Sequence, residues 1–150
     1  MPVDPAIAQN VRRHVLLKPE RSETFIASIG LQGSIEDLDP RLVRYIQVIE
    51  QTLSTPRPLP MVCAGIAVSP RTLSRLTHAA FNCAPGKLSA RIRLDHAAGL
   101  LRSTSRQLSD ISDASGYRST AHFSDAFYQR LRIRPGRYRA THKAVSDREI

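Results

Sequence analysis

Arginine is the residue type with the clearest binding chemistry in this chain, because a guanidinium binds phosphate and can pair with both acceptors of guanine. The 150 residues carry a net charge of +9. Residues 59–150 hold 15 basic and 6 acidic side chains, whereas residues 1–58 hold 7 of each. This uneven charge predicts a polyanionic partner, although charge alone does not distinguish DNA, RNA, anionic lipid or a merely soluble basic domain.

Catalytic and metal chemistry lack the residues they would need. Cys63 and Cys83 lie in apolar surroundings without neighbouring histidines, so we interpret them as reduced core thiols rather than a zinc site or a disulfide. No Ser/His/Asp arrangement, carboxylate pair or phosphate-cradling glycine loop can be defended. We therefore expect a protein that is not an enzyme and has no cofactor and no metal site.

Membrane insertion is not expected either. The longest apolar run, residues 61–67, is far shorter than the ~20 residues of a membrane-spanning helix, and no signal segment opens the chain. We expect a cytoplasmic protein with no membrane partner.

Two segments of the basic half repeat one another. The residues Leu59, Val62, Cys63, Ala67 and Val68 recur 49 positions later as Leu108, Ile111, Ser112, Gly116 and Tyr117. The residues Ser69, Leu73, Ser74 and Thr77 recur 50 positions later as Ser119, Phe123, Ser124 and Phe127. Each copy is typical of a helix-turn-helix: a short helix, a tight turn, a capping serine and a second helix.

Local chemistry supports this interpretation. The turn positions Ala67 and Gly116 are expected to need a positive φ, which glycine adopts freely. Ser69 precedes Pro70 as an N-cap before a helix-compatible proline. The polar residues after each capping serine are then expected to face outward at a helix N-terminus, where a DNA major groove can receive them.

The remaining elements complete an all-α prediction. Asp39 and Pro40 start a helix expected to end before Pro56. A long helix over residues 85–102 would span about 27 Å, so it could place two recognition helices in successive major grooves, about 34 Å apart, without dimerisation. We predict about seven helices in a homeodomain-like fold of two helix-turn-helix subdomains joined by this linker helix. Residues 1–38 are predicted as an arm with one helix and a linker, 39–142 as the DNA-binding domain and 143–150 as a tail.

Residues 56–139 resemble the paired helix-turn-helix domain of AraC/XylS-type transcription regulators. The resemblance is carried by the run Val68-Ser69-Pro70-Arg71-Thr72-Leu73-Ser74-Arg75, by Arg93-Leu94, Ala97 and Leu100-Leu101, and by Ile111, Gly116-Tyr117, His122-Phe123-Ser124, Phe127, Pro135 and Tyr138-Arg139. It implies a bacterial regulator that binds specific double-stranded DNA and activates or represses transcription, with RNA polymerase as a contact. It implies no particular effector.

Residues 5–57 resemble, more weakly, regulators with a glutamine-amidotransferase-like domain before this module. The carriers are Val11, Leu16, the stretch Lys18-Pro19-Glu20-Arg21 and the stretch Asp39-Pro40-Arg41-Leu42. Those regulators are considerably longer. The chain is accordingly expected to be a standalone short form, an excised piece or a remnant of a longer regulator.

The resemblance also assigns candidate DNA contacts. In the first recognition helix it places Arg71, Ser74 and Arg75 outward, with Arg75 as the candidate guanine reader. In the second, the corresponding residues are Thr120, Ala121 and Asp125, which are suited to thymine methyl groups or to an acceptor facing cytosine N4. The other candidates are Ser69, Thr72, Ser119, His122 and Ser124, together with Arg137. Arg137 is expected to follow the DNA backbone with Arg130, Arg132, Arg134 and Arg139, the alternative being a solvated basic face.

Departures from the family pattern cluster in the first unit, at Pro58, Ala67, Thr77, Asn82 and Leu88. An alanine at a left-handed turn costs about 1 kcal/mol, and loss of a core aromatic costs more, so the first unit is expected to be the less stable. In the second unit, Asp125 stands where the family often has a DNA-contacting arginine. The alternative function is a shortened regulator that acts through protein contacts and binds DNA weakly or without specificity.

Overall fold

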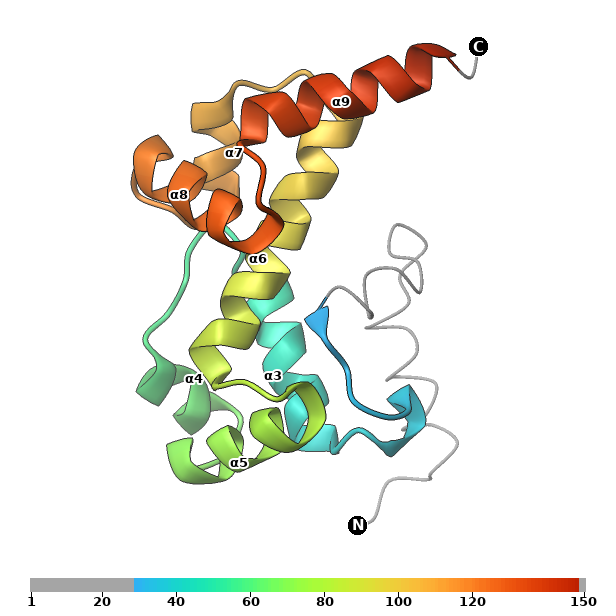
Figure 1. The fold of residues 1–150 in the computed structure, drawn as a ribbon. Helices are drawn as coiled ribbons and strands as arrows, with labels where there is room; N and C mark the ends of the chain where they lie inside the picture. Colours follow the sequence, from blue (N-terminus) through green and yellow to red (C-terminus); the bar gives the residue numbers. More distant parts are fainter. Residues whose placement is uncertain (1–28, 149–150) are drawn as a thin grey trace. The chain divides into compact units, whose positions relative to one another are not determined.

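The computed structural model describes residues 29–148, which form two compact units (Figure 1). The first contains residues 29–52 and 57–92, and the second contains residues 53–56 and 93–148. Seven α-helices and one short 3-10 helix lie within the described range, and no strand does. The all-α prediction is confirmed, whereas residues 1–28 of the predicted arm lie outside the described residues.

The first long helix of the first unit is α3, Pro40–Gln51. Its N-cap is Asp39, whose Oδ1 accepts a hydrogen bond from the backbone N–H of Arg41 at 2.8 Å. The helix buries one apolar face and ends well before Pro56. The predicted start and stop are both confirmed.

Residues 29–38, predicted as part of an arm and linker, pack against the rest of the first unit. Ile29 and Leu38 are buried, and a 3-10 helix, η1, covers Ile35–Asp37. The backbone N–H of Gln32 donates to the carbonyl of Ala80 at 2.6 Å. The guanidinium of Arg91 donates to the carbonyl of Ile29 at 3.1 Å. The described end of this segment therefore belongs to the core of the first unit, and the boundary at residue 38 stays a prediction.

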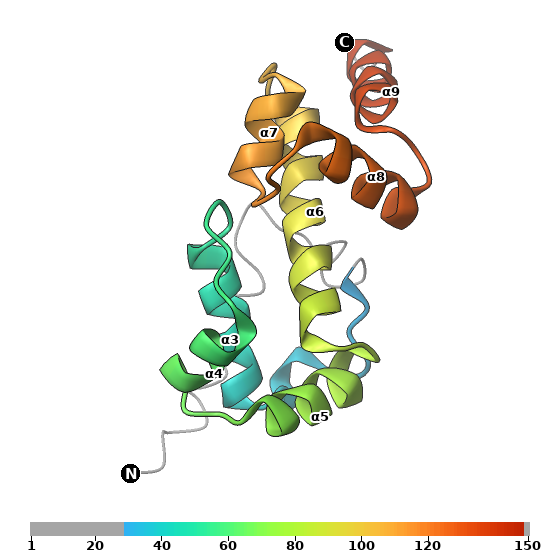
Figure 2. The same cartoon turned by 90° about the vertical axis from the view of Figure 1, so that its left-hand side faces the viewer.

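Two helices and the start of a third complete the first unit: α4 (Leu59–Gly65), α5 (Pro70–Phe81) and α6 (Pro85–Ser103). Figure 2 shows α6 as one continuous helix. Its residues up to 92 belong to the first unit and those from 93 to the second. The long helix predicted over 85–102 is confirmed with one additional residue.

The second unit packs α7 (Leu108–Ala114), α8 (Thr120–Leu131) and α9 (Pro135–Arg148) with the end of α6. Its core contains Phe123 and Phe127, whose ring centroids lie 5.8 Å apart. The helix α9 extends to Arg148, so the described part of the predicted tail continues this helix.

Candidate nucleic-acid interface

The first helix-turn-helix consists of α4, a tight turn and α5. The turn residue Ala67 has φ +56°, which confirms the predicted left-handed conformation. The N–H of Val68 then donates back to the carbonyl of Cys63 at 3.0 Å. Ser69 caps α5, because its Oγ accepts from the N–H of Thr72 at 3.1 Å and donates to the Thr72 hydroxyl at 2.9 Å. Ser69 and Thr72 are thus engaged in starting the helix.

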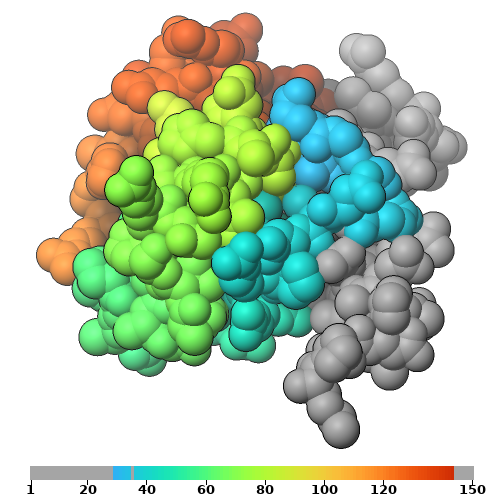
Figure 3. All heavy atoms as spheres, turned by 90° about the horizontal axis from the view of Figure 1, so that it is seen from below, coloured from blue at the N-terminus to red at the C-terminus, as the bar shows by residue number. Residues whose placement is uncertain are grey.

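The outward face of α5 carries two uncommitted guanidinium groups. Arg71 and Arg75 are one turn apart and exposed, and neither has a hydrogen bond or ion pair with any described residue. Ser74 lies between them and is half-buried. Its carbonyl accepts from the hydroxyl of Thr77 at 3.1 Å. Figure 3 shows α5 as green and yellow-green atoms at the surface of the first unit. The structure therefore brings the three predicted residues of this helix onto one accessible face.

The second helix-turn-helix, α7 to α8, follows the same plan. Gly116 has φ +86°, and the N–H of Tyr117 donates to the carbonyl of Ser112 at 3.0 Å. Ser119 caps α8 by accepting from the N–H of His122 at 3.0 Å. The hydroxyl of Ser112, which is buried, donates to the carbonyl of Ser119 at 3.2 Å. A small residue is needed at this position because the cap lies directly against it.

The N-terminal turn of α8 presents small residues and a histidine. Thr120, Ala121 and His122 are all exposed. The His122 ring also packs edge-on against Tyr117, with centroids 5.5 Å apart. Burial raises the pKa of Tyr117, and the nearby Arg93 partly offsets the effect. Because of its ring contact with Tyr117, His122 supports the turn while remaining accessible at the surface.

Asp125, predicted as an acceptor facing cytosine N4, forms an ion pair with Arg134 in the structure. Its Oδ1 accepts from Nη1 of Arg134 at 2.8 Å, and the same Nη1 donates to the hydroxyl of Ser124 at 3.2 Å. The guanidinium carbon lies 4.8 Å from the ring centroid of Tyr128. Sequence reasoning placed Arg134 only among backbone-tracking arginines. The available signal was the opposite charge of residues 125 and 134 on either side of a helix end.

A family model described as a helix-turn-helix domain matches residues 62–141, which is more than half of the chain and runs from within α4 into α9. The chain belongs to the AraC-type helix-turn-helix family. The C-terminal domain of AraT, a response regulator from Geobacillus stearothermophilus, is 32% identical, with 70% of this chain and 88% of that one aligned at a TM-score of 0.65. A transcriptional regulator with an AraC-type DNA-binding domain from Chromobacterium violaceum is 29% identical, covering 69% and 92% at a TM-score of 0.65.

Among curated relatives, the HTH-type transcriptional regulator GbdR of Pseudomonas aeruginosa is 28% identical over 115 residues. The match covers 77% of this chain and 31% of GbdR, so the AraC-type chain spans about a third of that relative. These relatives are regulators rather than enzymes, in agreement with the expectation from the sequence. The comparisons do not show a relationship to regulators with a glutamine-amidotransferase-like domain. That weaker resemblance of residues 5–57 therefore stays a prediction.

Arg137 and Arg139, two arginines of α9 in the AraC-type domain, differ in their contacts. Arg137 is exposed and its side chain has no hydrogen bond or ion pair with the described residues, as a backbone contact requires. Arg139 differs, because its Nε donates to the carbonyl of Leu101 at 3.3 Å and its side chain is half-buried. Arg139 therefore binds the C-terminal turn of α6, and its expected role in following the DNA backbone stays a prediction.

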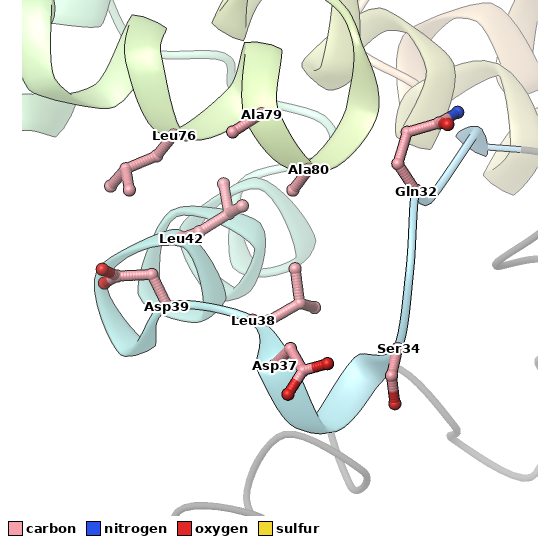
Figure 4. A pocket seen from close by; sticks show the side chains of 9 residues that line it. All are labelled: Gln32, Ser34, Asp37, Leu38, Asp39, Leu42, Leu76, Ala79 and Ala80. Carbon is pink, nitrogen blue, oxygen red and sulfur yellow. The ribbon is translucent and has the colours of Figure 1, made fainter.

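One open pocket of about 210 Å³ lies within the first unit (Figure 4). Residues between 32 and 42 line one side, and Leu76, Ala79 and Ala80 of α5 line the other. The carboxylate of Asp39 is engaged by Arg41 at 2.9 Å.

Within residues 29–148, no three potential ligand side chains gather for a metal ion, and no helix is both long and apolar enough to cross a bilayer.

Proposed function

We propose that this AraC-type chain binds specific sequences of double-stranded DNA through two recognition helices, α5 and α8, and thereby regulates transcription. The observation that carries the proposal is the outward face of α5, where Arg71 and Arg75 are exposed without a partner in the described residues. Exposed arginines without a partner, near the start of the second helix of a helix-turn-helix, are suited to contact the bases of a major groove.

The two arginines have different roles in this proposal. Arg75 lies one turn inside the helix and reads guanine, because its side chain can reach a base edge with two parallel hydrogen bonds. Arg71 lies in the first turn of α5, where the positive end of the helix dipole favours a phosphate. Ser74 lies between the two arginines in the sequence, and its hydroxyl is 3.4 Å from Nδ1 of His78. In this proposal its short side chain makes a polar contact with DNA.

The second helix reads with smaller groups. Thr120 and Ala121 are exposed in the first turn of α8, where methyl groups can contact thymine. Ser119 and the N–H groups of this turn are placed for a phosphate, with Arg137 as a further backbone contact. The second unit thus contributes positioning and modest base readout.

We propose that the chain acts in the cytoplasm and activates or represses transcription, with RNA polymerase as its protein contact. The chain spans 31% of GbdR. DNA recognition is assigned to residues 59–148.

Selection of bound duplexes from a random pool, followed by fluorescence anisotropy on the enriched sequence and a shuffled one, tests the function. We expect a recurring motif and a preference of the order of a thousandfold for it at physiological salt. The variant combining Arg71→Ala with Arg75→Ala is the control, with folding checked by circular dichroism, and should lose most of the preference. Equal affinity of the intact chain for enriched and shuffled DNA would support the alternative of a regulator acting through protein contacts.

A further inference from the structure

The ion pair between Asp125 and Arg134 lies on the outward face of the second recognition helix. Residues 121, 124, 125 and 128 share this face of α8 because they are three or four positions apart. Arg134 follows the helix and folds back onto it, where it contacts Asp125, Ser124 and the ring of Tyr128. Three residues of one helix face therefore hold a single guanidinium in place.

The internal repeat relates the positions of Asp125 and Arg134 to positions in the first unit. At an offset of 50, the capping residues Ser69 and Ser119 correspond, and so do the left-handed residues Asn82 and Arg132 that end α5 and α8. In that register Arg75 corresponds to Asp125, and Ala84 to Arg134. Each unit thus has one arginine at this pair of positions. In the first unit the arginine, Arg75, lies on α5, and in the second the arginine, Arg134, follows α8.

Stability does not account for the pair. The side chains of Arg134 and Asp125 are 54% and 67% exposed, and exposed pairs contribute little to folding. A guanidinium has five N–H donors, and both hydrogen bonds of Arg134 are made by Nη1. The donors on Nε and Nη2 are left for another acceptor, on a side chain whose position is already restricted.

We propose that Arg134 is the guanine-reading residue of the second unit and that Asp125 is its positioning residue. The proposal rests on the DNA-binding function proposed above and specifies how α8 performs it. A phosphate contact would need only charge, whereas reading guanine needs a fixed guanidinium plane, which the three contacts supply. Asp125 then aligns the arginine and does not itself face cytosine.

The test compares affinity for the selected DNA motif and for shuffled DNA across a set of variants. Arg134→Ala should lower affinity for the motif about 5- to 150-fold and relax the preference at one base position. Arg134→Lys should relax the same position while keeping more of the affinity for shuffled DNA, because it preserves charge but not the planar fork. Arg137→Ala is the matched control and should weaken both DNAs by the same factor.

Two double variants separate the roles of the pair. Asp125→Asn should weaken motif binding in the intact background but have no further effect in the Arg134→Ala background, because the two residues act as one unit. Asp125→Arg combined with Arg134→Ala copies the first unit's arrangement and should restore the preference lost in Arg134→Ala. Thermal unfolding of each variant should stay close to that of the intact chain.

The outcomes distinguish this inference from the function on which it rests. An intact chain that selects no motif would overturn both. A motif that is selected by the intact chain and read equally well by Arg134→Ala would overturn the inference alone. A change of base preference by Asp125→Asn in the Arg134→Ala background would assign the reading to Asp125 instead.

Discussion

The guanidinium of Arg93 donates a hydrogen bond to the backbone carbonyl of Leu53, and both residues belong to the second unit. Arg93 is only 7% exposed. A Cβ added to Gly116 would lie 2.6 Å from this same carbonyl oxygen and 2.7 Å from Cγ of Pro56. The segment 53–56 is therefore held against the turn of the second helix-turn-helix, which leaves no room for a side chain there.

Gly116→Ala should destabilise the second unit strongly. The substitution places an alanine at φ +86°, which costs about 1 kcal/mol or more, and the Leu53 backbone must also shift. Urea unfolding followed by circular dichroism measures the change. The matched variant Ala67→Gly relieves the same kind of strain in the first unit and should raise the free energy of unfolding by a few tenths up to about 1 kcal/mol. A neutral Gly116→Ala would contradict the close approach of residues 53–56.

Arg75→Ala should change specificity as well as affinity. Loss of a bidentate guanine contact costs about 1 to 3 kcal/mol on the selected motif and relaxes one base position. Anisotropy titrations with single-base variants of the motif measure both effects. Arg137→Ala, from an exposed arginine on α9, should instead weaken all duplexes evenly. If Arg75→Ala behaves like Arg137→Ala, Arg75 contacts a phosphate.

DNA binding should depend steeply on salt. The basic excess in residues 59–150 must neutralise several phosphates, and six such contacts lower affinity roughly a thousandfold between about 50 and 200 mM salt. Anisotropy titrations over a salt series give the slope of log affinity against log salt. An affinity independent of salt would rule out phosphate contacts as the main attraction.

The first helix-turn-helix should open more readily than the second. It has a strained Ala67 at its turn and Thr77 at a fully buried position where the second has Phe127. Hydrogen exchange with mass spectrometry should show faster exchange in residues 59–80 than in 108–130, with the difference reduced by DNA carrying the motif. The hydroxyl of Thr77 is satisfied by Ser74, so equal exchange in the free protein would mean that packing in the first unit compensates for the smaller side chain.

Local features were predictable from the sequence for a physical reason. A capping serine, a left-handed turn residue and a proline at the first helical position act within three or four residues, so Ser69, Ala67 and Pro40 are recognisable without the fold. The internal repeat then predicted two helix-turn-helix units and the outward face of α5. The AraC-type resemblance also includes the capping residue Ser69, whereas Ala67 departs from the family pattern.

Contacts between residues far apart in the chain were decided only by the tertiary structure. Arg93 reaches Leu53 and Arg91 reaches Ile29 across 40 and 62 positions, and no local pattern specifies which carbonyl a buried guanidinium will find. Arg139 and Arg137 are only two positions apart on one basic helix, yet the first bonds to α6 and the second faces outward. An arginine's role depends on which acceptors packing brings within reach, because its long side chain can bond to any of several partners.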